Sequence, residues 1–212
     1  MQDNRISIKI SLLGNSGVGK SSIILRYNND KFDPNCNSTN GASYAQKVIC
    51  INDVLYQLDI WDTAGQEKYR SIGQNFYREA YIVILVYDIT RQESLEGLKE
   101  MWYPDLLKFG EKYKIVAVVG NKCDRFEEEN IVNEDEAREF AKEINAHFFI
   151  TSAKTGTNVK HLFENLIELY VEPDFQDKIN QNSLHRRGSQ RIRNPQNEEE
   201  EKKNEEEEKK CC

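Results

Sequence analysis

Short apolar runs alternate with amphipathic stretches along residues 1–175, and this order most narrows the folds open to the chain. The runs have the length and the apolar, β-branched character of strands, and the stretches have helical periodicity. Such an alternation is typical of a doubly wound α/β domain with a mostly parallel sheet. The predicted strands are 5–13, 44–51, 55–61, 81–89, 114–120 and 147–151, and the predicted helices are 20–28, 92–109, 134–144 and 158–171.

One pair of strands departs from the parallel arrangement. Asn52 and Asp53 alone separate the second predicted strand from the third, and this is a signal for a tight antiparallel hairpin. The later strands are continuous apolar runs, as expected when helices cover both faces of a sheet. We therefore predict a six-stranded, mostly parallel sheet with one antiparallel strand and helices on both faces. Ligands of such sheets bind at the carboxyl ends of the strands.

The composition changes near residue 176. Residues 1–175 are predicted to form one folded domain, whereas 176–212 bury too little apolar area to offset their ordering entropy and are predicted to be disordered. Acidic and basic residues balance in the tail, so the formal net charge of −7 belongs to the domain and disfavours nucleic acid as a partner. The five cysteines show no zinc spacing, and we find no signal peptide or membrane-spanning run, so we expect a reduced, intracellular protein.

The first predicted strand leads directly into "GNSGVGKS", and a predicted helix follows. This fits the phosphate-binding pattern G-x-x-x-x-G-K-[ST] in its required context, which makes a plain glycine turn a weak alternative. Backbone N–H groups and the helix N-terminus would face phosphate oxygens. Lys20 is predicted to bridge the β- and γ-phosphates, and the Ser21 hydroxyl is predicted to bind Mg²⁺. The predicted contacts are Gly14, Asn15, Ser16, Gly17, Val18, Gly19, Lys20 and Ser21.

Two later motifs point to guanine. In "NKCD" the carboxylate of Asp124 would accept hydrogen bonds from guanine N1–H and the 2-amino group, a donor pair that adenine lacks. Asn121 would fix the loop and reach the base edge, and the stem of Lys122 would pack over the purine ring. The tripeptide Ser152, Ala153 and Lys154 follows the last strand and would add backbone N–H groups toward the guanine oxygen.

The stretch "DIWDTAGQEKY" ends the third predicted strand. Asp62 is placed like a carboxylate that holds Mg²⁺ through water. The Gly65 N–H would meet the γ-phosphate, and Gln66 would orient the attacking water. A surface turn is the alternative interpretation of this stretch.

These motifs together resemble the Ras-like small GTPases, and most closely the Rab family, over residues 5–171. The Rab-like stretches include "WDTAGQEKYRSI", "FYREAYIVILVYDIT" and the terminal "CC", and "GAS" is similar to endosomal Rabs. The resemblance implies a P-loop small G domain with switches at 32–44 and 62–79. It also implies that Thr39 closes on Mg²⁺ and the γ-phosphate and that Ser22 contacts the α-phosphate. Tyr44, Trp61 and Phe76 would present the switch state to partners.

Three positions depart from that pattern. Asn40 replaces an isoleucine beside the switch threonine, Glu79 replaces a glycine, and "LKEMWYP" is more similar to the Rho branch. Pro104 in that stretch is predicted to kink its helix.

The resemblance further implies a switch that hydrolyses GTP slowly to GDP, with an activating protein supplying an arginine. It implies partners of six kinds: an exchange factor, an activating protein, a GDP-dissociation inhibitor, the prenylation machinery, effectors of the GTP state and a membrane. A nucleotide-binding scaffold without turnover and an ATP-using P-loop kinase are the alternative classes.

The tail is predicted to attach the protein to a membrane. Cys211 and Cys212 resemble a double prenylation site, which would place the protein on the cytoplasmic face of an intracellular membrane. The resemblance of "GAS" to endosomal Rabs implies an endosomal one. Lys209 and Lys210 would lie next to the anionic surface, whereas the glutamates would act further out as a spacer. Ser189 in "HRRGSQRIR" fits a basophilic kinase site, and a plain solvated stretch is the alternative.

Overall fold

The computed structural model describes residues 5–36, 39, 42–65, 76–110, 113–127 and 131–172. The chain divides into two compact units, Met1–Glu168 and Leu169–Cys212, and every contact discussed below lies within the first. The predicted domain boundary at residue 175 and the predicted disorder beyond it fall outside the described residues and stay predictions.

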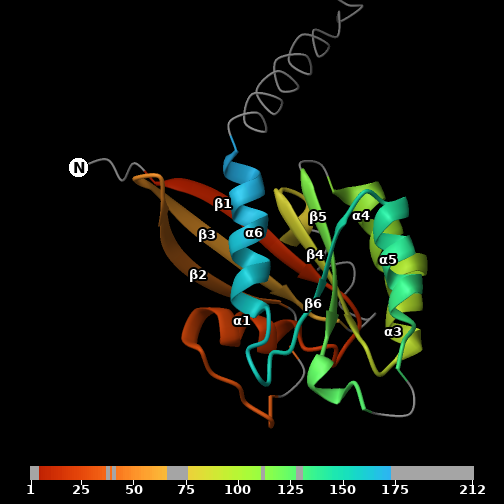
Figure 1. Ribbon diagram of the computed structural model, residues 1–212. Coiled ribbons are helices and arrows are strands. Elements are labelled where there is room, and N and C mark those ends of the chain that lie inside the picture. Colours follow the sequence, from red (N-terminus) through yellow and green to blue (C-terminus); the bar gives the residue numbers. More distant parts are fainter. Residues whose placement is uncertain are drawn as a thin grey trace, which may run out of the picture. The chain divides into compact units, whose positions relative to one another are not determined.

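A six-stranded sheet forms the centre of the first unit, in the order β2-β3-β1-β4-β5-β6 (Figure 1). β1 pairs with β3 and with β4 in parallel, and β5 continues the parallel pairing to β6. The strands are β1 (Ile6–Leu13), β2 (Ala42–Ile51), β3 (Val54–Thr63), β4 (Ile82–Asp88), β5 (Ile115–Asn121) and β6 (His147–Ile150). The carboxyl ends of β1, β3, β4, β5 and β6 therefore lie at one edge of the sheet.

The β2–β3 hairpin supplies the one antiparallel pair. Asn52 and Asp53 at its turn have φ of 50° and 62°, the left-handed values that a two-residue hairpin loop needs and that Asn and Asp tolerate. The hairpin and the α/β fold class are confirmed as predicted, and each predicted strand and helix is present with small shifts at its ends.

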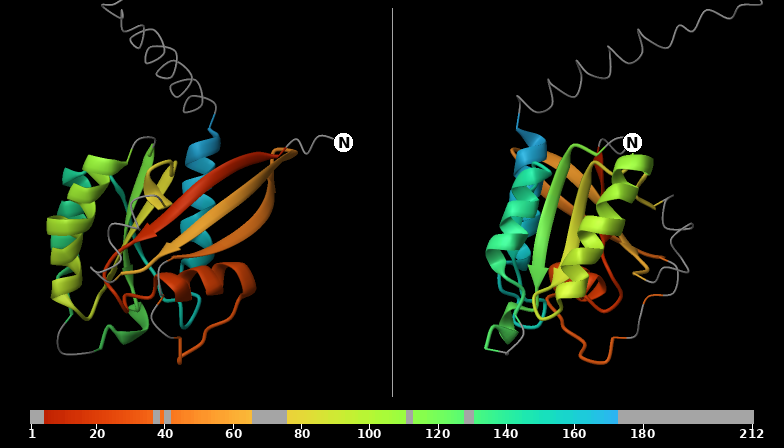
Figure 2. Two further views of the ribbon diagram at one scale, coloured as in Figure 1. Left: turned by 180° about the vertical axis from the view of Figure 1, so that it is seen from behind. Right: turned by 90° about the vertical axis from the view of Figure 1, so that its right-hand side faces the viewer.

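Helices cover both faces of the sheet, because the strands carry apolar side chains on both faces. In β4, Val83, Leu85 and Tyr87 belong to one core cluster, whereas Ile82 and Ile84 are fully buried on the opposite face. The helix residues of that cluster are Leu95, Leu98, Trp102, Leu106, Ala137, Phe140 and Ala141. On that second face α1 packs against β2 and β3, and its Tyr27 stacks on Phe163 of α6 with ring centroids 3.9 Å apart. Figures 1 and 2 show α1 apart from the group of α3, α4 and α5. The helices are α1 (Lys20–Asn29), α3 (Gln92–Gly97), α4 (Tyr103–Phe109), α5 (Glu134–Glu143) and α6 (Val159–Val171).

The predicted helix 92–109 contains a change of helical type instead of a single α-helix. A π-helical turn, η2 (Leu98–Trp102), joins α3 to α4, and Pro104 lies in the first turn of α4. Proline has no N–H to donate to the preceding turn, and a π-helical turn relieves the clash that an α-helical path would create. The backbone stays right-handed helical at Leu98 and Tyr103, so the helical path continues through the turn.

The Tyr27–Phe163 stack is expected to hold α6 on the sheet. Phe163 is fully buried, so Phe163→Ala should lower the free energy of unfolding by about 3–5 kcal/mol. Leu107→Ala is the control, because Leu107 is 55% exposed and its loss should cost no more than about 0.5 kcal/mol. Urea denaturation of both variants with saturating ligand checks this, and equal midpoints for both variants would contradict it.

Candidate nucleotide-binding site

A cavity of about 380 Å³ opens at the sheet edge where the parallel strands end. It is lined by residues from five segments that are distant in sequence, and four of these segments carry the predicted motifs. The lining residues are Ser16, Gly17, Gly19, Lys20, Ser21, Ser22, Phe32, Asp33, Pro34, Cys36, Thr39, Gly65, Asn121, Lys122, Asp124, Arg125, Ala153 and Lys154. The fold therefore brings most of the predicted site residues to one hollow.

The loop between β1 and α1 is held close to its neighbours. Gly19 has φ of 98°, and a Cβ there would lie 2.3 Å from Asn121 Nδ2, so only glycine fits. The Lys20 ammonium donates to the carbonyl oxygens of Gly14 (2.7 Å) and Asn15 (3.1 Å). Val18 is fully buried and anchors the loop in the core.

Burial dominates the electrostatics of Lys20, whose side chain is 5% exposed. Burial lowers the pKa of Lys20 from 10.5 to about 8, which the Asp62 carboxylate opposes and the Arg91 charge reinforces. The free site thus holds a desolvated cation, and its charged form would be stabilised by an anion placed in the cavity.

The Asn121 side chain joins three loops. Its Nδ2 donates to the Val18 carbonyl (2.9 Å), and its Oδ1 accepts from the Thr151 hydroxyl (3.2 Å) and the Ala153 N–H (3.2 Å). These three hydrogen bonds all go to protein groups and fix the loops to one another, whereas the contact of Asn121 with the base edge stays a prediction.

Asp124 and Lys122 occupy the far end of the cavity. The Ser152 hydroxyl donates to Asp124 Oδ1 (2.6 Å), and Lys154 Nζ lies 3.7 Å from Oδ2. Lys122 takes the left-handed conformation with φ of 71°, and its ammonium lies 2.6 Å from the Asp88 carboxylate. Lys122 lines the cavity, and the packing of its stem over a purine ring stays a prediction.

Three oxygen donors converge beside Lys20. The Ser21 and Thr39 hydroxyls both donate to Asp62 Oδ2, at 2.5 and 3.0 Å, and lie 2.9 Å from each other. Asp62 is 2% exposed, and its Oδ1 has no hydrogen-bond partner among the described residues. Two hydroxyls and a buried carboxylate with one orphaned oxygen fit a hard cation such as Mg²⁺, which prefers oxygen ligands and keeps several waters. Within the described part of the chain, no cluster of three or more His, Cys, Asp or Glu side chains offers another metal site.

The second switch begins against the phosphate-binding loop. A Cβ on Gly65 would lie 2.4–2.5 Å from backbone atoms of Asn15 and Ser16, so this glycine permits the close approach. Ser22 lines the cavity next to Ser21.

The three predicted aromatic residues form a continuous row on the surface beside the switches. Trp61 lies between Tyr44 and Phe76, with ring centroids 5.0 Å from each. Tyr44 is 49% exposed, and its hydroxyl donates to Asp59. That hydrogen bond is the main cause that raises the pKa of Tyr44, with burial second.

Some predicted residues lie outside the described residues. They are Asn40, Gln66, Ser189, Cys211 and Cys212.

Sequence reasoning missed several residues that shape the site. Phe32 lines the cavity and is 36% exposed, and its isolated position just after α1 was the available signal. Trp102 Nε1 donates to Asn15 Oδ1 (2.7 Å), and the Asn15 amide donates to the Glu93 carbonyl (3.3 Å). Arg91 donates to the Ser16 carbonyl (3.0 Å). No motif marks these residues, because each acts through a contact distant in sequence.

Comparisons with known proteins identify the family. The model of the Ras family matches residues 9–172. The chain belongs to the Ras family. Human Ras-related protein Rab-22A is 43% identical over 156 residues, covering 74% of this chain and 79% of its own length. Human Ras-related protein Rab-3A is 42% identical over 164 residues, covering 77% and 74%, and the fission yeast (Schizosaccharomyces pombe) GTP-binding protein ypt5 is 41% identical over 177 residues, covering 83% and 82%.

This Ras-family chain is thus a Rab-type small GTPase, an enzyme that hydrolyses GTP to GDP and serves vesicle trafficking. The P-loop NTPase small G domain predicted from the sequence is confirmed. The comparisons also decide against a P-loop kinase and a scaffold without turnover.

The Lys20 environment of this GTPase predicts proton uptake on binding. With a pKa of about 8 in the free site, most Lys20 is neutral at pH 8.5, and phosphate oxygens should restore its proton. Binding of GDP to nucleotide-free protein should then take up about two thirds of a proton more at pH 8.5 than at pH 7. Calorimetry in two buffers of different ionisation enthalpy measures this, and equal uptake at both pH values would contradict it.

Proposed function

We propose that the chain binds GTP or GDP together with Mg²⁺, hydrolyses GTP slowly, and acts as a membrane-anchored switch. One observation carries the proposal: the Thr39 hydroxyl lies against Ser21 and Asp62, in the cavity that also holds Lys20 and Asp124. A segment of the first switch thereby meets the predicted metal donors and the phosphate-binding loop at one place.

Guanine is the base that Asp124 supports. The Ser152 hydroxyl holds one carboxylate oxygen of Asp124, so the side chain has a fixed orientation at the cavity wall. A carboxylate so fixed would accept from guanine N1–H and the 2-amino group, while adenine would leave it unpaired. The exposed ring of Phe32 and the stem of Lys122 line the same cavity and offer apolar surface to a purine.

Mg²⁺ would be held by Ser21 and Thr39 directly and by Asp62 through water. When bound, Mg²⁺ neutralises charge on the β- and γ-phosphates. Thr39 would be held closed by its contacts with Mg²⁺ and the γ-phosphate. Hydrolysis removes the γ-phosphate and would therefore release the first switch.

Hydrolysis would depend on three groups of this chain. Lys20 would take up charge on the phosphates, the Gly65 N–H would donate to the γ-phosphate, and Gln66 would orient the attacking water. Arg125 is the one arginine among the described residues that line the cavity, and it follows Asp124 at the base end. An activating protein that supplies an arginine is therefore expected to raise the rate by roughly 10³–10⁵.

Gln66→Leu tests the hydrolysis mechanism. The variant should bind GTP as the parent does and retain it when the activating protein is added, because leucine cannot orient water. Phosphate release in a single turnover, with and without the activator, is the measurement. Parent-like release by the variant in the presence of the activator would show that Gln66 does not have this role.

The aromatic row of Tyr44, Trp61 and Phe76 would be the surface that effectors of the GTP state contact. Tyr44 belongs to the first predicted switch and Phe76 to the second, so a change in either switch would alter the row. Glu79 lines a shallow hollow with Tyr44 and Trp61. This carboxylate, where the resembled pattern has glycine, would favour effectors that bring a basic side chain to the row.

The terminal cysteines would provide the membrane attachment. None of the described helices is long and apolar enough to cross a bilayer. Two prenyl chains on Cys211 and Cys212 give lasting anchorage at about 0.8 kcal/mol per buried CH₂, which exceeds the screened repulsion of the glutamates. The protein would then cycle between the cytosol and the cytoplasmic face of an endosomal membrane, carried by a GDP-dissociation inhibitor.

Two sets of tail substitutions separate the anchor from the spacer. Cys211→Ser combined with Cys212→Ser should move the protein to the soluble fraction, because the lipid supplies the binding energy. Serine in place of the eight tail glutamates, residues 198–201 and 205–208, should leave fractionation largely unchanged. Cell fractionation of both proteins is the measurement. Retention of the double cysteine variant on membranes would contradict the proposed lipid anchor.

Regulation would act through further partners. An exchange factor would open the cavity and release GDP, and the prenylation machinery would recognise the tail. Ser189 would be a site for a basophilic kinase, placing a charged group in the tail.

A further inference from the structure

The carbonyl groups of the phosphate-binding loop are held by donors from outside the loop's own backbone. Lys20 holds the Gly14 and Asn15 carbonyls, and Asn121 holds the Val18 carbonyl. The Ser16 carbonyl accepts instead from Arg91 Nη2 at 3.0 Å. Arg91 is not among the residues that line the cavity, so it contacts the loop from behind.

The geometry of a peptide unit makes this contact consequential. In a trans peptide the C=O of one residue and the N–H of the next point in opposite directions. Because Ser16 C=O points outward to Arg91, the N–H of Gly17 points the other way, and Ser16 and Gly17 both line the cavity. Arg91 therefore sets the direction of a donor that would face a bound phosphate, and its charge polarises that peptide toward stronger donation.

Arg91 is itself anchored to a buried carboxylate. Its Nε lies 3.3 Å from Asp88 Oδ2, an ion pair without hydrogen-bond alignment. The other Asp88 oxygen accepts from the Thr90 N–H (3.0 Å) and hydroxyl (2.8 Å). Asp88 is 1% exposed, so it cannot turn away to solvent, and the guanidinium has a fixed point of attachment.

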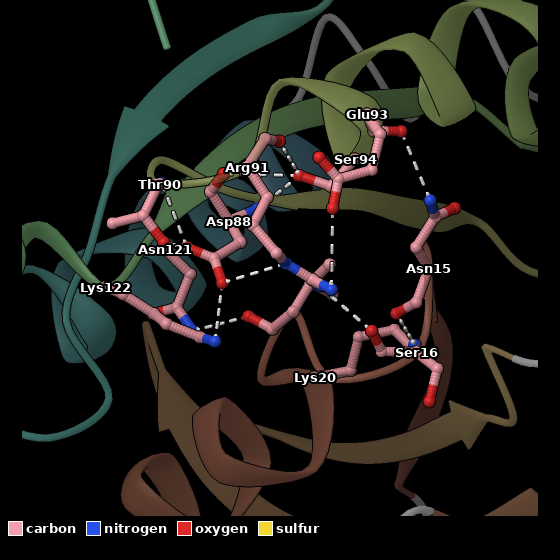
Figure 3. A network of polar contacts seen from close by, with 11 residues as sticks. Asn15, Ser16, Lys20, Asp88, Thr90, Arg91, Glu93, Ser94, Asn121 and Lys122 are labelled. Carbon is pink, nitrogen blue, oxygen red and sulfur yellow. Dashed lines mark hydrogen bonds and ion pairs between the residues drawn. The ribbon is translucent and has the colours of Figure 1, made fainter. Parts of the chain in front are cut away.

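The same carboxylate connects Arg91 to the base-recognition motif. Lys122 Nζ lies 2.6 Å from Asp88 Oδ2, on the oxygen that also meets Arg91 (Figure 3). Burial alone would raise the pKa of Asp88, but hydrogen bonds from Lys122 and Thr90 outweigh it and hold the pKa below its ordinary value. A charged carboxylate thus links the two cations, and through them the phosphate-binding loop and the "NKCD" loop.

From this chain of contacts we infer that Arg91 is a positioning residue for nucleotide retention. By bridging the Ser16 carbonyl and Asp88, it keeps the Gly17 N–H directed at the phosphates and slows the release of bound guanine nucleotide. Both ends of the bridge matter, because a guanidinium donates from several nitrogens in a fixed plane, whereas an ammonium donates from one.

Two substitutions at this position distinguish the bridge from packing. Arg91→Met keeps an unbranched stem of similar length without donors, and it should accelerate release of a fluorescent GDP analogue about tenfold, the effect of losing one charge-assisted hydrogen bond. Arg91→Lys keeps one cationic donor and should accelerate release about threefold, since it reaches one end of the bridge only. The measurement is the dissociation rate in excess unlabelled GDP and Mg²⁺.

Arg138→Met is the matched control, because Arg138 pairs with Glu134 on the exposed surface of α5. This variant should release the analogue at the parent rate. If Arg91→Met releases the analogue at the parent rate, Arg91 acts only by packing, and the inference is overturned. Equal acceleration by Arg138→Met overturns it as well, because the effect would then follow from loss of any arginine.

Discussion

The hydrogen bonds of Asn121 hold the parts of the site together. One amide group reaches the Val18 carbonyl of the phosphate-binding loop and also binds Thr151 and Ala153 of the last loop. These loops follow β1, β5 and β6, which are far apart in sequence and meet because parallel strands end at one edge of the sheet. A side chain at Gly19 would collide with the Asn121 amide, so this position requires glycine. The cavity is thus one site, with the predicted phosphate-binding loop at one end and the predicted guanine motif at the other.

The side chains around this amide carry more positive charge than the nearby buried carboxylates neutralise. Lys20 is desolvated and has a lowered pKa, and Asp88 pairs with both Lys122 and Arg91. Desolvated cations gain more from a phosphate than exposed ones do, because water screens them less. The acidic net charge of the whole chain conceals this local reversal.

Sequence patterns predicted the fold well where the signal was local. Continuous apolar runs marked the parallel strands, and the Asn52-Asp53 turn marked the antiparallel pair, because each depends on residues that are adjacent in the chain. The motif residues around Lys20, Asp62 and Asp124 followed for the same reason, since each motif sits directly after a strand.

The features that the sequence did not predict depend on contacts between segments that are distant in the chain. Arg91 contacts Ser16 across 75 residues, and Trp102 contacts Asn15 across 87, so neither residue stands out from its neighbours in the sequence. Thr39 was found only through the family resemblance, because a loop threonine has no signature of its own. The π-helical turn before Pro104 was not predicted, because the hydrogen-bonding type of a helix around a proline is not marked by a local motif, and the kink stays a prediction.

The central claim is that phosphate-binding and guanine-selecting loops form a single site, and competition between purines tests it most directly. Purified protein with Mg²⁺ and a bound fluorescent GDP analogue would be titrated with GDP and, in parallel, with ADP. Because adenine would leave the carboxylate of Asp124 unpaired, ADP should displace the analogue at least about a thousandfold less well than GDP. Displacement by ADP and GDP at similar concentrations would contradict the account.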